Sequence, residues 1–112
     1  MLQRNLIVTI DGHKRIEFDR SGGIPAQERA RLDELDRMLG EEGVNLNGQH
    51  IATPDQEQKA YYMVEYLLNV LLDDDMERAA LVCTYVGTRL PNLVGVHART
   101  VGETFDVDLQ FD

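Results

Sequence analysis

The chain has 112 residues and a mass of 12.7 kDa, which is the size of one domain and too small for two. With 43% hydrophobic and 28% charged residues, it can bury a core and is neither disordered nor collagen-like. There are 20 acidic against 11 basic residues, so the formal net charge is −9, and no segment is strongly basic. Electrostatic binding to nucleic acid or to an anionic membrane is therefore not expected.

The sequence carries no pattern typical of secretion or membrane insertion. The longest apolar stretch, residues 66–72, is interrupted by Asn69, and Asp11 and Lys14 occur where a signal peptide would stay apolar. Cys83 is the single cysteine, which excludes an internal disulfide and a cysteine-based zinc cluster. We therefore expect a soluble, cytoplasmic protein without a membrane partner.

The first predicted element is a β-hairpin. Residues 6–10 are rich in β-branched side chains, and Asp11-Gly12, a strong hairpin signal, separates them from residues 15–18. We expect a three-residue loop, 11–13, because that register keeps the apolar residues on one face, with the pairs Leu6–Phe18 and Val8–Ile16. Ile7 then faces the other side, so this strand is predicted to lie inside a sheet rather than at its edge.

Two helices are predicted in the middle of the chain. The first starts at Pro25 and ends at Gly40 or Gly43, because apolar residues recur at spacings of three and four: Leu32, Leu35, Met38 and Leu39. The second begins with a capping box in which Thr53 is the N-cap and Gln56 the third helical residue. Its apolar face covers much of its circumference, so we expect this helix at the centre of the core.

Two further segments leave an alternative open. Residues 44–51 contain Asn47-Gly48 and form either a small β-ribbon or an ordered loop. Residues 76–90, after a break and cap at 73–75, have apolar residues at helical spacing and are predicted as a helix folded back on the previous one. The alternative is a strand, because β-branched residues alternate there: Val82, Thr84, Val86 and Thr88.

The last predicted element is a second hairpin, formed by residues 93–99 and 104–111. A turn centred on Val101-Gly102 places apolar residues on one face, with the pairs Ala98–Phe105, Val96–Val107 and Val94–Leu109. On the opposite face the same turn gives the pairs His97–Asp106, Arg99–Thr104 and Gly95–Asp108.

These elements predict the fold class. We expect a single domain, residues 1–112, of the α+β class. A mostly antiparallel sheet, built from the N- and C-terminal hairpins, is predicted to pack against about three helices in two layers.

The candidate site lies on the second hairpin. His97, Asp106 and Asp108 share one face, and an imidazole with two carboxylates can bind a divalent cation or take part in proton transfer. Opposite charges on neighbouring strands also simply stabilise a sheet, by about 0.2–1 kcal/mol per pair, and that role is more common. Tyr62 points away from the main apolar stripe of its helix, so it is a candidate for an interaction surface or a partly buried core residue.

Other candidate residues have a structural explanation. No nucleotide-binding loop, zinc-protease motif or EF-hand loop occurs, and the three histidines lack the spacing of metal ligands. Ser21 and Gly22-Gly23 precede a helix that can hold an anion, but a flexible connection explains them better. Cys83 falls on an apolar helical face, where cysteine is inert.

The sequence favours a non-enzymatic, regulatory or protein–protein interaction module without a cofactor or metal. The negative charge suits a basic protein partner, and the apolar helix pair suits self-association as a homodimer. The alternative is a metal- or small-molecule-binding enzyme that uses His97 with Asp106 and Asp108. A second alternative, an acidic mimic of nucleic acid, requires carboxylates along one elongated face, whereas the acids here are spread over several elements.

Overall fold

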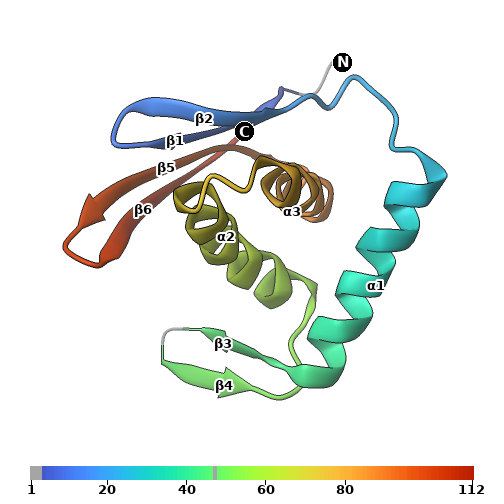
Figure 1. The fold of residues 1–112 in the computed structure, drawn as a ribbon. Coiled ribbons are helices and arrows are strands. Elements are labelled where there is room, and N and C mark those ends of the chain that lie inside the picture. The colour runs from blue at the N-terminus through green and yellow to red at the C-terminus, as the bar shows by residue number, and fades with distance from the viewer. Residues whose placement is uncertain (1–3, 47) are drawn as a thin grey trace.

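The chain folds into a mixed four-stranded sheet with helices packed against one face (Figure 1). The structure is a computed structural model that describes residues 4–46 and 48–112. In chain order the elements are β1 (Leu6–Ile10), β2 (His13–Phe18), α1 (Ala26–Glu42), β3 (Val44–Leu46), β4 (Gln49–Ile51), α2 (Gln56–Leu72), α3 (Met76–Arg89), β5 (Leu93–Val101) and β6 (Thr104–Phe111). The strand order is β2-β1-β5-β6; β1 and β5 run parallel and the outer pairs antiparallel. The predicted α+β class is confirmed.

The core lies between the sheet and the antiparallel pair of helices α2 and α3. The inward faces of β1 and β5 contribute buried residues: Leu6, Val8, Ile10, Leu93, Val96 and Ala98. α2 contributes the largest set: Ala60, Met63, Val64, Leu67, Leu68, Val70 and Leu71. Its position at the centre of the core was predicted, although Leu72 at its end is 50% exposed. β1 lies inside the sheet, as the outward position of Ile7 indicated.

The register of the first hairpin was predicted correctly, but the length of its loop was not. Leu6 pairs with Phe18 as expected, yet the turn contains only Asp11 and Gly12, both with positive φ, as in a type I′ turn. A β-bulge at Arg15 absorbs the extra residue. The bulge has a structural use, because the Arg15 guanidinium donates to the backbone carbonyl of Leu71 at 2.8 Å and so caps the C-terminus of α2.

The second hairpin keeps the predicted faces but shifts by two residues. The turn is Gly102-Glu103, with Gly102 at φ +62°, so Val101 pairs with Thr104 and the predicted turn position is wrong. The apolar pairs become Ala98–Val107 and Val96–Leu109, and the polar pairs become His97–Asp108, Arg99–Asp106 and Gly95–Gln110. A Gly at the first turn position suits a two-residue type II′ loop, which sets this register.

The helices begin and end close to the predicted residues. α1 follows Pro25 and ends at Gly43, and α3 is a helix rather than the alternative strand, capped by the Asp75 carboxylate. The predicted N-cap of α2, Thr53, is wrong, because Asp55 forms the reciprocal capping box with Gln58. β3 and β4 form a two-stranded antiparallel ribbon; the turn residue Asn47 lies outside the described residues.

Helix α1 is held to α3 by a polar network as well as by apolar contacts. It buries only Leu32 fully. The Asp36 carboxylate accepts hydrogen bonds from the hydroxyl of Tyr85 at 2.5 Å and from Nη2 of Arg89 at 2.6 Å. Tyr85 has no exposed surface and Arg89 keeps 16% of its side chain exposed, so this network replaces hydration at a largely dry contact.

We expect Tyr85 to lower the stability of the fold in alkaline solution. Burial, followed by the hydrogen bond and charge of Asp36, raises the pKa of Tyr85 well above its ordinary value of 10.0. Because the folded-state pKa is the higher one, the stabilisation is complete below pH 10.0 and is lost as the pH rises above it. Urea unfolding between about pH 8 and 11 should therefore show a steeper loss of stability for wild type than for Tyr85→Phe. Parallel pH profiles would contradict this.

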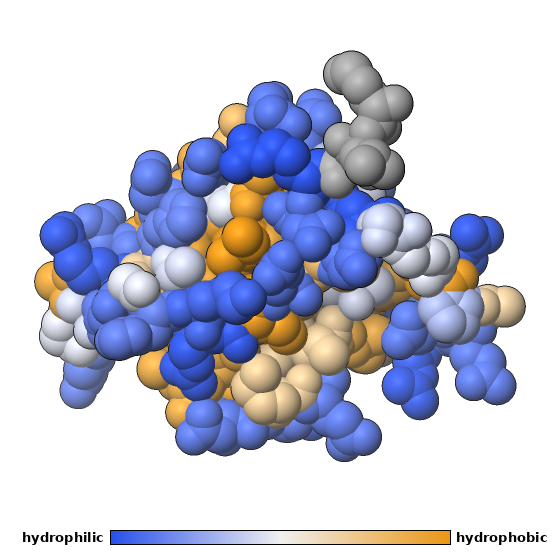
Figure 2. Space-filling model, turned by 90° about the horizontal axis from the view of Figure 1, so that it is seen from above, coloured by the Kyte–Doolittle hydropathy of each residue, from blue (hydrophilic) through white to orange (hydrophobic). Residues whose placement is uncertain are grey.

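Most of the surface seen from above, over the first hairpin, is hydrophilic, with hydrophobic side chains between the charged ones (Figure 2). A few large apolar side chains are exposed: Met38, Leu72, Met76, Val101 and Phe111. Among the described residues, no helix has the length and apolar character needed to cross a membrane.

Candidate functional site

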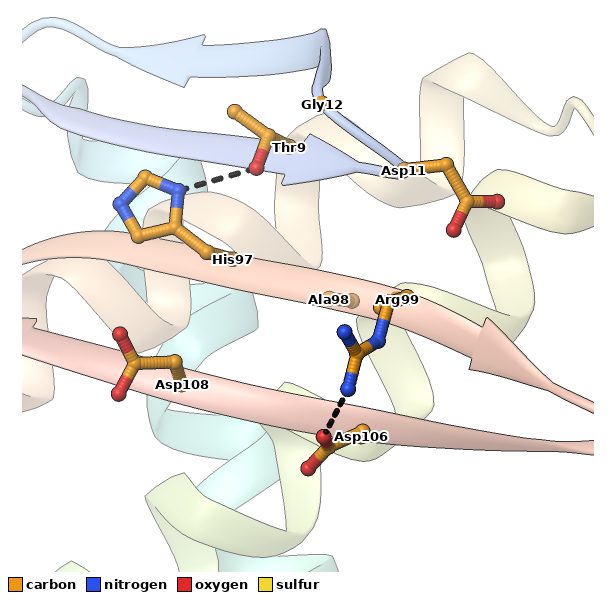
Figure 3. Close-up of a pocket in the computed structure, with 8 residues that line it drawn as sticks. All are labelled: Thr9, Asp11, Gly12, His97, Ala98, Arg99, Asp106 and Asp108. Atoms are coloured by element: carbon orange, nitrogen blue, oxygen red, sulfur yellow. Dashed lines mark hydrogen bonds and ion pairs between the residues drawn. The ribbon is translucent and has the colours of Figure 1, made fainter.

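The face of the sheet that the helices leave open carries the candidate residues. A cavity of about 660 Å³ lies over β1, β5 and β6, and its lining includes Thr9, His97, Arg99, Asp106 and Asp108 (Figure 3). The three residues predicted on one face of the second hairpin therefore line one cavity. β1 contributes the remaining wall, because it pairs in parallel with β5 and sets Thr9 directly beside His97.

The imidazole of His97 is turned toward β1 and away from Asp108 (Figure 3). Its Nδ1 lies 3.0 Å from the hydroxyl of Thr9, and its Nε2 lies 3.1 Å from Oε1 of Gln110. Gly95 makes this position available, because a Cβ at that residue would lie 2.6 Å from Nε2 of His97. Both ring nitrogens are thus engaged by neutral side chains, and neither meets a carboxylate.

The carboxylates of the cavity differ in how they are bound. Asp106 accepts from Arg99 at 2.9 Å in an exposed ion pair. Asp11, in the first turn, accepts from the backbone N–H of Thr100 at 2.9 Å and from its hydroxyl at 2.8 Å; these hydrogen bonds lower the pKa of Asp11. Within the described residues, no hydrogen bond or ion pair engages the carboxylate of Asp108. It is therefore the acid most available to a ligand.

The cavity is negative, with three carboxylates against one guanidinium, a formal balance of −2. Over residues 4–46 and 48–112, no group of three His, Cys, Asp or Glu side chains is placed to hold a metal ion. His97 contacts neither Asp106 nor Asp108, so the geometry offers no direct acid–base pair. What the arrangement offers is an exposed negative surface with hydrogen-bonding side chains.

The other candidate residues lie away from this cavity. Tyr62 is half-buried on α2 and does not line it. Ser21 donates to the carboxylate of Asp19, which gives its loop a negative group and disfavours an anion there. Cys83 is buried, and desolvation raises the pKa of its thiol to about 12, so it is an inert core residue.

The cavity also receives two polar side chains from the first hairpin that were not predicted to lie there: Thr9 and Asp11. Both reach the second hairpin only because β1 pairs with β5, a contact between segments 88 residues apart. Asp11-Gly12 gave a turn signal and nothing more. The one available indication was the prediction that β1 is an inner strand, because the side chains on both faces of an inner strand lie beside side chains of the strands that flank it.

Comparisons with known proteins found no match to this chain. No family model, curated protein sequence or solved structure matches it.

Proposed function

We propose that the protein is a non-catalytic interaction module that binds a basic segment of a partner protein on the open face of its sheet. The observation that carries this proposal is the negative cavity over β1, β5 and β6, in which Asp108 has no bound counter-charge among the described residues. The Arg99–Asp106 pair beside it is exposed and can exchange partners at little cost, because surface ion pairs contribute about 0–1 kcal/mol.

The charge of the whole chain supports the same partner. A net charge of −9 on 112 residues attracts basic surfaces over several ångströms and accelerates their association. The attraction is screened by salt, so binding through this surface is expected to weaken steeply as ionic strength rises.

The chemistry of the candidate nucleophiles also favours binding over catalysis. The Cys83 thiol is buried with a raised pKa. The Ser21 hydroxyl donates to the carboxylate of Asp19, and the same hydrogen bond lowers the pKa of Asp19, so this carboxylate is a weak base. Activated nucleophiles need a nearby base or a lowered pKa.

The alternative is a metal- or small-molecule-binding enzyme that uses His97, Asp106 and Asp108. Their shared cavity is the observation that favours it. The orientation of His97 toward Thr9 and Gln110 weighs against it, because metal binding would have to break one of these hydrogen bonds.

The test is a binding titration with a lysine octapeptide, followed by fluorescence anisotropy at about 10 mM salt. Replacing both exposed acids of β6 (Asp106→Asn with Asp108→Asn) should weaken binding about tenfold, because two ion pairs are lost and Arg99 is left to repel the peptide. The matched control carries Glu28→Gln and Glu42→Gln on α1, which changes the net charge equally.

The outcomes separate the hypotheses. If the two double variants bind the peptide equally weakly, the peptide is attracted by the net charge of the chain alone. That result would overturn the assignment of the binding surface to the open face of the sheet. A rise in melting temperature with a divalent cation, abolished by His97→Gln, would favour the metal-binding alternative instead.

A further inference from the structure

The outer strand β6 has an open edge. It is the last strand in the order β2-β1-β5-β6, and in the described part of the chain no strand lies along its outer side (Figure 1). Its length of 8 residues exceeds that of most edge strands, which proteins usually keep short. Val101 and Thr104 flank a two-residue loop and so form a hydrogen-bonded pair. Along β6 from Thr104, the backbone N–H and C=O groups point alternately toward β5 and away from it. Those that point away from β5, to the open edge, belong to Phe105, Val107 and Leu109.

The apolar side chains of β6 are only partly covered. Phe105, Val107 and Leu109 face the helix layer but are half-buried, and Phe111 at the end of the strand is 46% exposed. A groove of about 270 Å³ lies between α2 and β6, with Leu68, Phe105 and Val107 among its lining. A further strand alongside β6 would therefore place its own apolar side chains over this groove.

Acidic residues border both faces of this edge. Asp106 and Asp108 stand on the open face, while Glu65 and Glu103 line the groove on the helix side. The described residues that line the groove include no basic side chain. Basic side chains on an added strand would therefore meet carboxylates on the open face, while apolar side chains enter the groove.

A second copy of the chain fits this edge poorly. A two-fold antiparallel β6 pair centred on residue 106, 107 or 108 sets carboxylates directly opposite carboxylates, because Asp106 and Asp108 would face their own symmetry copies or each other. Like charges directly opposite on neighbouring strands are destabilising. Charge complementarity thus selects a basic partner over self-association.

We propose that β6 takes up an extended segment of a partner protein, with basic and apolar side chains alternating, as a fifth strand of the sheet. This deepens the proposed function, on which it rests, by naming the form of the partner. Backbone hydrogen bonds would supply affinity, while the groove and the carboxylates would select the side chains.

The test uses a labelled octapeptide of alternating lysine and valine with the full chain. In an added strand only one alternate set of peptide amides faces β6, so N-methylation of that set should weaken binding at least tenfold. N-methylation of the other set is the matched control and should change the affinity less than threefold. Amide hydrogen exchange of Phe105, Val107 and Leu109 should slow when the unmodified peptide binds.

Each other outcome overturns the proposal. If the peptide binds through Asp106 and Asp108 but both N-methylated forms weaken equally, strand addition fails while the acidic interaction surface stands. If the unmodified peptide does not bind at low salt, both proposals fail. If these three amides are already protected in the free protein and light scattering gives the mass of two chains, a second copy covers β6 and the basic segment is not its occupant.

Discussion

Replacing Asp36 with alanine is expected to destabilise the fold by about 2–3 kcal/mol and to release helix α1 first. The variant leaves the guanidinium of Arg89 and the hydroxyl of Tyr85 without their shared acceptor at a contact that is nearly dry. Breaking a fully buried pair costs about 3–5 kcal/mol. The partial exposure of Asp36, 27%, reduces that figure.

The measurement is urea unfolding combined with hydrogen exchange. Because α1 fully buries only Leu32, its amides should lose protection before those of α2 and α3. Asp33→Ala is the control, since Asp33 lies 3.4 Å from the same Arg89 but is 79% exposed, and should cost no more than about 0.5 kcal/mol. A uniform loss of protection over all three helices would show that α1 is not an independent unit.

Gly87→Ala is the second substitution with a large expected effect, a net loss of about 2 kcal/mol. A Cβ at this position of α3 would lie 2.3 Å from Cδ2 of Phe18 on β2, so the Phe18 ring would have to turn out of its packed position or the helix would have to move away from the strand. Alanine is intrinsically better than glycine within a helix by about 1 kcal/mol, so any net loss must come from the contact.

A double-mutant cycle checks this explanation. Phe18→Leu removes the ring that the new methyl group meets, so Gly87→Ala should cost less, or stabilise, in that background. Additive effects of the two substitutions, measured by thermal unfolding, would show that the loss arises elsewhere in α3.

The second hairpin shows how far hydrophobic patterning determines register. A slip of one residue would set Asp106 or Asp108 opposite Ala98 on the apolar face, so the alternation of side chains excludes it. A slip of two residues leaves every side chain on its own face, and patterning cannot detect it. The turn decides between the two registers, because Gly102 at φ +62° fits the first position of a two-residue loop.

The first hairpin was misjudged for a related reason. Apolar pairing favoured a three-residue loop, whereas Asp11-Gly12 favoured two, and the structure satisfies both by placing the surplus residue in a bulge at Arg15. The use of that residue depends on α2, since Arg15 contacts the carbonyl of Leu71, 56 residues away. A local pattern contains no information about such a contact.

The candidate site was predictable to the same extent as the hairpin that carries it. The shared face of His97, Asp106 and Asp108 follows from a period of two along the strands. The direction of the His97 ring does not, because it depends on Thr9 across the parallel pair and on the space that Gly95 leaves. Faces could thus be predicted from the sequence, but contacts between distant segments could not.

The parallel pairing of β1 with β5 has a consequence for synthesis on the ribosome. β1 is synthesised well before its inner neighbour β5, since the paired residues Thr9 and His97 are 88 positions apart. Until β5 follows, the nascent β1 has one unsatisfied side, which is a target for chaperones and for mispairing with other nascent chains. Closure of this long loop is therefore expected to be the slow, late event in folding.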